Sequence, residues 1–174
     1  MHRPRLAYLA LAFAALLFGS TFVIIKEAVV SLPPLAFVGW RFLLGGAVLA
    51  LIGLPRGRAV WRDGLIAGSL LFAGYALQTV GLAHTSASNS GLITGLYVVL
   101  TPLLAALVAR RAPGLLISLG ALLAFGGLAL LTLNQGLRLR YGDLLTVGCA
   151  LSYAAHIVYL AGVAPRHRVI PFTA

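Results

Sequence analysis

Apolar residues dominate six long segments of the chain, and short polar or turn-forming segments separate them. An α-helix rises about 1.5 Å per residue, so roughly 20 apolar residues in helical form cross the hydrocarbon core of a bilayer. Each segment is close to that length. The pattern predicts an all-α polytopic membrane protein with six transmembrane helices, at residues 6–30, 34–54, 64–84, 90–109, 114–133 and 143–163.

The segments between the apolar runs are short and contain residues that favour turns. Proline, glycine, serine and asparagine recur in them, at residues 31–34, 55–57, 86–89, 113–114 and 134–136. Such residues end helices, and a connection of a few residues returns the chain beside the helix it has just left. Consecutive helices are therefore expected to form antiparallel hairpins.

The composition agrees with a membrane location. Hydrophobic residues make up 61% of the 174 residues, charged residues only 9%, and the mean hydropathy is +1.03. A soluble domain carries roughly 25% charged residues, so this chain cannot cover a water-facing surface. Its single cysteine, Cys149, cannot form an internal disulfide, which excludes a disulfide-stapled secreted module.

The positions of the basic residues indicate how the chain is oriented in the membrane. The net charge is +10, but the Lys and Arg residues lie in short clusters between apolar runs, a pattern that favours membrane orientation signals over nucleic-acid binding. A cytoplasmic N-terminus places nine arginines inside: Arg3, Arg5, Arg56, Arg58, Arg62, Arg110, Arg111, Arg166 and Arg168. It leaves three basic residues outside: Lys26, Arg138 and Arg140. The bias predicts a bacterial-type cell membrane protein with a cytoplasmic N-terminus.

The first and sixth apolar runs share a weak internal similarity. Residues 15–23 and 150–158 both have an Ala-Leu start, an aromatic residue, two small residues and a valine. If the sixth helix repeats the first, the unit has five helices, and an odd number inverts the second copy in the membrane. We expect a first five-helix repeat at residues 6–133 and the beginning of a second at residues 142–174, in a chain cut from a longer one.

Several motifs carry a family resemblance. They are Phe18-Gly19-Ser20-Thr21-Phe22 with Lys26, Arg41-Phe42-Leu43-Leu44, the run from Gln78 to Gly91 followed by Leu96 and Thr101-Pro102, Gly120 with Gly126-Gly127, and Gly142-Asp143-Leu144-Leu145. Together they resemble the EamA family of the drug/metabolite transporter superfamily. The resemblance implies a ten-helix carrier of two inverted repeats around a central cavity, which exports a small metabolite, an amino acid or a drug. Because this chain ends after six expected helices, we expect that the missing C-terminal repeat or a second copy completes the cavity.

Three ionisable residues lie within the first two apolar runs. Lys26, Glu27 and Arg41 fall at similar depths, roughly 8–13 Å below the turn at residues 32–33, from the rise of 1.5 Å per residue. Charge at such depth is costly, so each group needs a partner or a purpose. Glu27 and Arg41 are placed to pair across the hairpin. Lys26 and Arg41 either extend to the outer interface or attract an anionic or zwitterionic substrate.

A polar stripe follows the third run. Tyr75, Gln78 and Thr79 are spaced i, i+3, i+4 and share one helix face, which in lipid must face protein or water. They either bond a neighbouring helix or line the substrate pathway together with Tyr97.

The fourth run begins and continues with unusual residues. Ser88 or Asn89 is expected to cap its N-terminus, leaving a positive dipole end that binds a carboxylate or is simply capped. Pro102 interrupts the backbone hydrogen bonds and predicts a kink or hinge.

Other features concern packing and protons. Small residues one turn apart predict close helix packing at residues 64–68, 91–95 and 120–124. His156 is the only titratable group near mid-depth of the sixth run, where it either relays protons or makes one fixed hydrogen bond.

The sequence favours a carrier over an enzyme. The four histidines lie in different segments, and neither a nucleophile–base pair, a metal-ligand pattern nor a phosphate-binding glycine loop occurs. We therefore expect no catalytic residue, cofactor or metal, and as partners a small-molecule substrate, the lipid bilayer, and the missing C-terminal repeat or a second copy, but no nucleic acid. The alternative is a non-transporting membrane assembly or receptor component, a rigid bundle without a water-accessible polar cavity.

Overall fold

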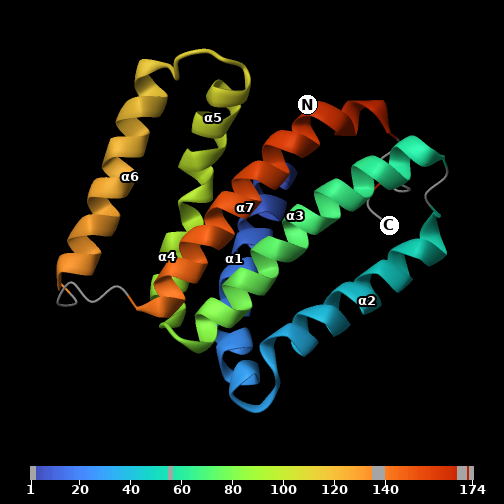
Figure 1. Ribbon diagram of the computed structural model, residues 1–174, viewed down its shortest axis with the longest axis horizontal. Coiled ribbons are helices and arrows are strands. Elements are labelled where there is room, and N and C mark those ends of the chain that lie inside the picture. The colour runs from blue at the N-terminus through green and yellow to red at the C-terminus, as the bar shows by residue number, and fades with distance from the viewer. Residues whose placement is uncertain (1–2, 55–56, 135–139, 168–171, 173–174) are drawn as a thin grey trace.

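The computed structural model describes residues 3–54, 57–134, 140–167 and 172 (Figure 1). In these ranges the chain is helical and contains no strand. The helices are α1 (Arg3–Ser31), α2 (Pro34–Ile52), α3 (Arg58–Ala83), α4 (Ala87–Gly95), α5 (Tyr97–Val108), α6 (Leu115–Asn134) and α7 (Tyr141–Val163), followed by the short 3₁₀ turn η1 (Ala164–Arg166).

The all-α polytopic prediction is confirmed. Five stretches of the described chain are long and apolar enough to cross a bilayer: Tyr8–Ser31, Pro34–Ile52, Arg58–Ala83, Ala87–Val108 and Tyr141–Arg166. Helix α6 is apolar over Leu115–Gly127, the part of the helix whose side chains the structure describes continuously. The largest differences from expectation are that α3 begins at Arg58 rather than near residue 64 and that the fourth span is divided into α4 and α5.

The division between α4 and α5 lies at Leu96. The Leu96 amide donates to the Ile93 carbonyl oxygen at 3.1 Å, and the Val99 amide donates to Leu96 at 3.0 Å. Both bonds skip three residues instead of four, so the helix tightens locally. Pro102 lies inside α5, six residues beyond this break.

Local chemistry fixes the helix starts. Pro34 occupies the first position of α2, where its missing N–H costs nothing. The Ser86 hydroxyl accepts from the Asn89 amide at 3.1 Å and caps α4. The expected cap at Ser88 or Asn89 is therefore wrong, because the helix begins earlier, at Ala87. At the start of α7, the Arg140 amide donates to Asp143 at 3.0 Å.

Helix α7 is the centre of the bundle. It lies along α3 and also packs against α4 and α5, whereas α6 packs against α5 (Figure 1). Helix α2 contacts α3 and diverges from it toward its own C-terminal end, as Figure 1 shows. Two small buried clusters sit among these helices, one of Phe22, Ile25 and Leu82, the other of Ile93, Leu96 and Ala150.

Glycines do bring helices together, but not at the expected positions. A Cβ at Gly74 would overlap the Tyr153 ring, and Gly81 and Gly142 meet at the backbone. At the glycines of the expected motifs, Gly64, Gly68, Gly91, Gly95 and Gly120, no atom of another described helix lies within 4 Å of an added Cβ. The small-residue prediction is therefore wrong for these glycines, because spacing within one helix does not tell which helix lies opposite, although Ala124 of the third motif does pack against the Ile93 cluster.

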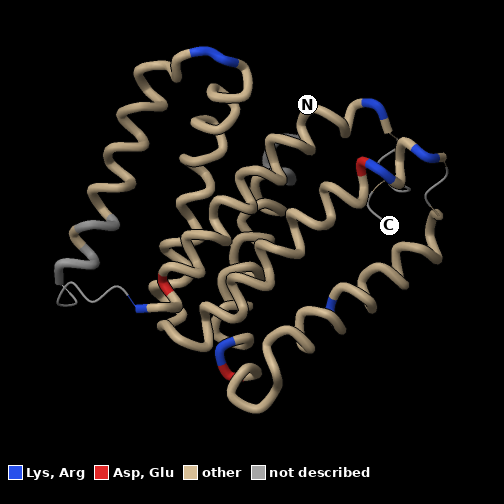
Figure 2. The backbone as a smooth tube through the Cα atoms, viewed as in Figure 1, with Lys and Arg blue, Asp and Glu red and all other residues tan. Residues whose placement is uncertain are grey.

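The outer surface is apolar and the charges gather at helix ends. Leucine, valine and phenylalanine side chains on α1, α2 and α6 are exposed, as expected where lipid is the solvent. Lys, Arg, Asp and Glu positions concentrate at helix ends and connections (Figure 2). Arg41 is the exception, since it lies within α2.

Candidate functional site: a cavity between α2, α3 and α7

A cavity of about 800 Å³ lies between α2, α3 and the C-terminal part of α7. Aromatic side chains form much of its wall: Phe42, Trp61, Phe72, Tyr75 and Phe172. Glycines 45, 46, 64 and 68 also line it, and their missing side chains leave room beside the helix backbones. Besides the aromatic residues, Arg41, Ser69 and His156 contribute polar side chains to its wall, and none of the described lining residues is acidic.

Arg41 supplies the positive charge of the cavity. Its guanidinium carbon lies 4.8 Å from the centre of the Tyr75 ring, within the range of a cation–π interaction. The expected pair with Glu27 is wrong. The ion pairs of the described residues do not include it, because Glu27 is exposed on α1 and Arg41 stacks toward α3.

An aromatic network holds Tyr75 in place. Its ring meets Phe42 and Tyr153 edge-on, with centroids 5.5 Å apart in both pairs. Tyr153 in turn contacts Tyr97 at 6.0 Å, so the cavity wall is joined to the start of α5. Tyr97 itself does not line the cavity but packs beside the Ile93 cluster. Edge-to-face pairs restrain the rings and give the wall a defined shape.

His156 lines the cavity from α7. Its Nδ1 lies 2.9 Å from the carbonyl oxygen of Ala67 on α3. A carbonyl only accepts, so Nδ1 carries the hydrogen, and in the neutral ring Nε2 is the acceptor. His156 thus has the fixed hydrogen bond foreseen as one alternative, and its proton relay stays a prediction.

Gln78 and Thr79 are buried between helices and do not line the cavity. The Gln78 side-chain amide donates to the Thr94 hydroxyl at 3.1 Å, which joins α3 to α4. Of the polar stripe, only Tyr75 reaches the cavity. The alternative of bonding to a neighbouring helix therefore describes Gln78.

Lys26 binds the end of a helix. Its ammonium donates to the carbonyl oxygens of Leu82 at 2.7 Å, Thr85 at 2.8 Å and Ala83 at 3.4 Å. These carbonyls lie at the C-terminus of α3, where a cation complements the helix dipole. Lys26 lies outside the cavity, and neither interface contact nor substrate attraction is needed to explain its position.

Asn89 and Pro102 also lie away from the cavity. The Asn89 backbone amide donates to the Ser86 hydroxyl that caps α4, and Pro102 is an interior position of α5. Of the six expected substrate-binding residues, the structure brings Arg41 and Tyr75 together in the cavity wall and distributes the other four among helix junctions.

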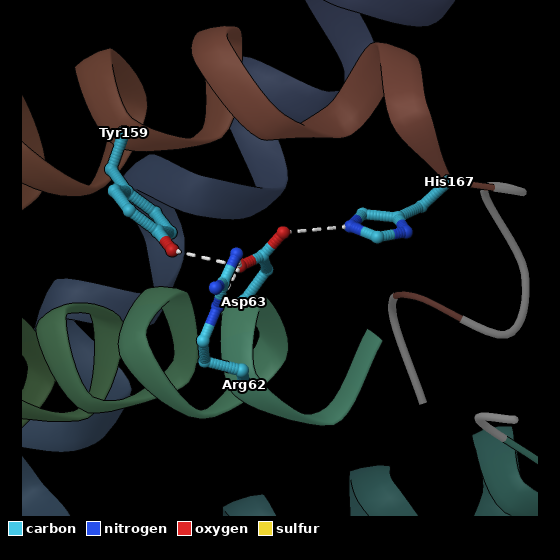
Figure 3. A network of polar contacts seen from close by, with 4 residues as sticks. All are labelled: Arg62, Asp63, Tyr159 and His167. Atoms are coloured by element: carbon cyan, nitrogen blue, oxygen red, sulfur yellow. Dashed lines mark hydrogen bonds and ion pairs between the residues drawn. The ribbon is translucent and has the colours of Figure 1, made fainter. Parts of the chain in front are cut away.

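Sequence reasoning missed a polar cluster around Asp63. This buried carboxylate accepts from Arg62 Nε at 3.0 Å and from Tyr159 Oη at 3.3 Å, and His167 Nε2 lies 2.9 Å from its second oxygen (Figure 3). The signal was available, since only three acidic residues occur in the whole chain. What sequence does not supply is the partner, because His167 is 104 residues away.

The helical fold with its long apolar helices defines a multi-pass membrane protein, and the open cavity between α2, α3 and α7 has room for a small molecule. The chain belongs to the EamA-like transporter family, whose profile matches residues 5–133.

Two curated relatives agree with this assignment. An uncharacterized transporter of Archaeoglobus fulgidus is 40% identical over 157 residues, which cover 89% of this chain and 49% of the relative. The uncharacterized transporter YvbV of Bacillus subtilis is 32% identical over 162 residues, covering 87% of this chain and 52% of the relative. The chain thus spans about half the length of the curated relatives it matches. No solved structure matches it.

Proposed function

We propose that this chain forms part of a secondary transporter that exports a small organic anion or zwitterion across the cell membrane by alternating access. Membership of a transporter family supports the transport role. The observation that carries the substrate class is Arg41, a permanent cation in the wall of a cavity whose described lining holds no acidic residue.

The cavity chemistry suits a substrate with a charged group and an apolar body. A carboxylate beside Arg41 gains a charge-assisted hydrogen bond, which is stronger in a water-poor site than in bulk solvent. The aromatic wall of Phe42, Phe72 and Tyr75 favours burial of an apolar or aromatic part. Ser69 and His156 offer further hydrogen bonds to a polar substituent.

In this proposal the described helices form one side of the transport pathway. Residues 6–133 are the first repeat and residues 142–174 begin the second. A second repeat or a second copy of the chain covers the side of the cavity where α2 diverges from α3. The cytoplasmic end is the one that carries Arg58, Arg62 and Arg166, in agreement with the charge bias of the connections.

A counterflow assay in proteoliposomes tests the proposal. Proteoliposomes that contain the natural protein are loaded in turn with benzoate, phenylalanine or benzamide. These probes are an anion, a zwitterion and an uncharged analogue. We expect exchange of benzoate or phenylalanine and none of benzamide. Arg41→Gln should lower exchange at least tenfold, while Arg41→Lys retains part of it.

Arg58→Gln serves as the matched control, because Arg58 is exposed on α3 and lies outside the cavity lining. It should exchange as the wild type does. Equal exchange by wild type and Arg41→Gln would contradict the substrate assignment, and no exchange of any of the three probes would contradict the proposed substrate class.

A further inference from the structure

The Asp63 carboxylate is buried, with an exposed fraction of only 2%, near the start of α3. Burying a carboxylate is costly unless charged or hydrogen-bonding partners surround it. Its Oδ2 faces His167 Nε2 at 2.9 Å, and its Oδ1 is shared by Arg62 and Tyr159 (Figure 3). Asp63 therefore ties the first turns of α3 to the segment that follows α7.

His167 also contacts a residue of the cavity wall. Its ring stacks on Phe172, with centroids 4.8 Å apart and planes inclined by 25°. Phe172 lines the cavity together with Trp61 and Leu160, at the end where α3 begins and α7 finishes. A single array thus runs from a buried carboxylate through an imidazole to an aromatic side chain in the cavity.

We propose that Asp63, His167 and Phe172 form a gate at this end of the cavity, in which the hydrogen bond between His167 Nε2 and Asp63 holds Phe172 against the opening. The proposal rests on the transport function proposed above. Breaking this hydrogen bond releases the end of α7 from α3, withdraws Phe172 and admits water or substrate.

Arg62 is a second, exposed partner of the same carboxylate. Its guanidinium lies 3.0 Å from Asp63 Oδ1 and its side chain is 69% exposed, so solvent screens this pair and α7 does not hold it. Arg62 therefore contributes little to the attachment between α3 and the end of α7.

Thiol accessibility tests the gate in the natural protein. Gly68 lines the cavity and has open space for a side chain, so Gly68→Cys is a suitable reporter. The native Cys149 is fully buried and supplies the background. A membrane-impermeant maleimide is applied to inside-out and right-side-out vesicles in turn. With Asp63→Asn, His167→Gln or Phe172→Ala added, the labelling rate of the reporter should rise at least tenfold from one membrane face.

The controls separate the gate from general loosening. Arg62→Gln removes an exposed partner of the same carboxylate but leaves its contact with His167. The labelling rate should therefore stay within about twofold of that of the reporter alone, well below the tenfold rise expected of the gate variants. Exchanging the pair, as Asp63→His with His167→Asp, should restore slow labelling. If the buried substitutions prevent folding, Phe172→Ala still decides the question, since Phe172 is only partly buried.

Unchanged labelling in folded Phe172→Ala would overturn the gate, as would a rise in Arg62→Gln equal to that in Asp63→Asn. Labelling does not require turnover, so the two proposals fail separately. Fast labelling without exchange of any probe leaves the gate and contradicts the transport proposal. Exchange of a probe by the wild type, together with unaltered labelling of the gate variants, supports the transport proposal and contradicts the gate.

Discussion

Gly81 of α3 and Gly142 of α7 meet backbone to backbone. A Cβ added to Gly81 would lie 2.8 Å from the Gly142 carbonyl oxygen, and a Cβ on Gly142 would overlap the Gly81 carbonyl oxygen. The Thr146 hydroxyl donates to that same Gly142 carbonyl at 2.8 Å. This contact seats the start of α7 on the end of α3.

Alanine at either glycine should therefore destabilise the protein. We expect Gly81→Ala and Gly142→Ala to lower the free energy of unfolding by about 1–3 kcal/mol, the usual cost of overpacking, because the colliding atoms belong to the backbone. Thermal unfolding of the purified protein in detergent measures the effect. Gly120→Ala is the control, since its Cβ meets open space, and it should be neutral or slightly stabilising in a helix. Equal melting of all three variants would contradict this view of the contact.

Thr85 and Asp143 add a polar bond to the same junction. The Thr85 hydroxyl donates to the buried Asp143 carboxylate. Thr85→Val removes the donor, and we expect a loss of about 1–3 kcal/mol in unfolding free energy because Asp143 Oδ1 loses the hydrogen bond that the α3–α4 connection gives it. A double-mutant cycle with Asp143→Asn measures the coupling, which should reach about 0.5–3 kcal/mol. Strictly additive losses would mean that the two side chains act independently.

Lys26 should matter for stability and not for substrate. Lys26→Met keeps the length of the side chain but leaves the α3 carbonyls without their cation, and we expect a loss of about 1.5–3 kcal/mol, as for hydrogen bonds to charged groups. Glu27→Gln, at the exposed neighbouring position, should change stability by less than about 0.5 kcal/mol. Benzoate affinity of folded Lys26→Met, measured by scintillation proximity, should equal that of the wild type. A selective loss of binding with unchanged melting would instead place Lys26 in the substrate site.

Tyr75 positions Arg41 through its ring. Tyr75→Phe keeps the π face and should leave benzoate affinity within about twofold of wild type. Tyr75→Leu removes the ring and should weaken binding by roughly two- to thirtyfold, which corresponds to the 0.5–2 kcal/mol of a cation–π contact. The same binding assay compares the two variants. Equal weakening in both would indicate that the hydroxyl, rather than the ring, contacts the ligand.

The helices could be predicted from the sequence because each depends on interactions within its own stretch of chain. A run such as residues 34–52 must become helical in lipid, since its own backbone supplies the only hydrogen-bond partners there. Pro34 marks the start of that helix for an equally local reason. The sequence predicts a kink at Pro102 but gives no sign of the break at Leu96, because a proline is visible in the sequence whereas the i+3 bonds that tighten the helix there are not.

The candidate site was only half readable. Arg41 and Tyr75 stood out because charge and hydroxyl groups are expensive in lipid, and the structure places both in the cavity wall. The same argument selected Lys26 and Gln78, which are equally expensive but are satisfied by the end of α3 and by Thr94. The free-energy cost of a polar group in lipid indicates that the group has a partner. It does not indicate whether that partner is part of the protein or the substrate.

The sequence by itself determined the membrane-spanning helices and the family, because hydropathy over about 20 residues and the motifs of residues 78–102 are properties of short stretches of chain. Only the tertiary structure decided which helix faces meet. It placed Gly81 against Gly142, opened the cavity beside Gly68 and joined Asp63 to His167 across 104 residues. These pairings follow from the crossing of α3 and α7, and the crossing is set by the summed packing of both helices rather than by any one residue along them.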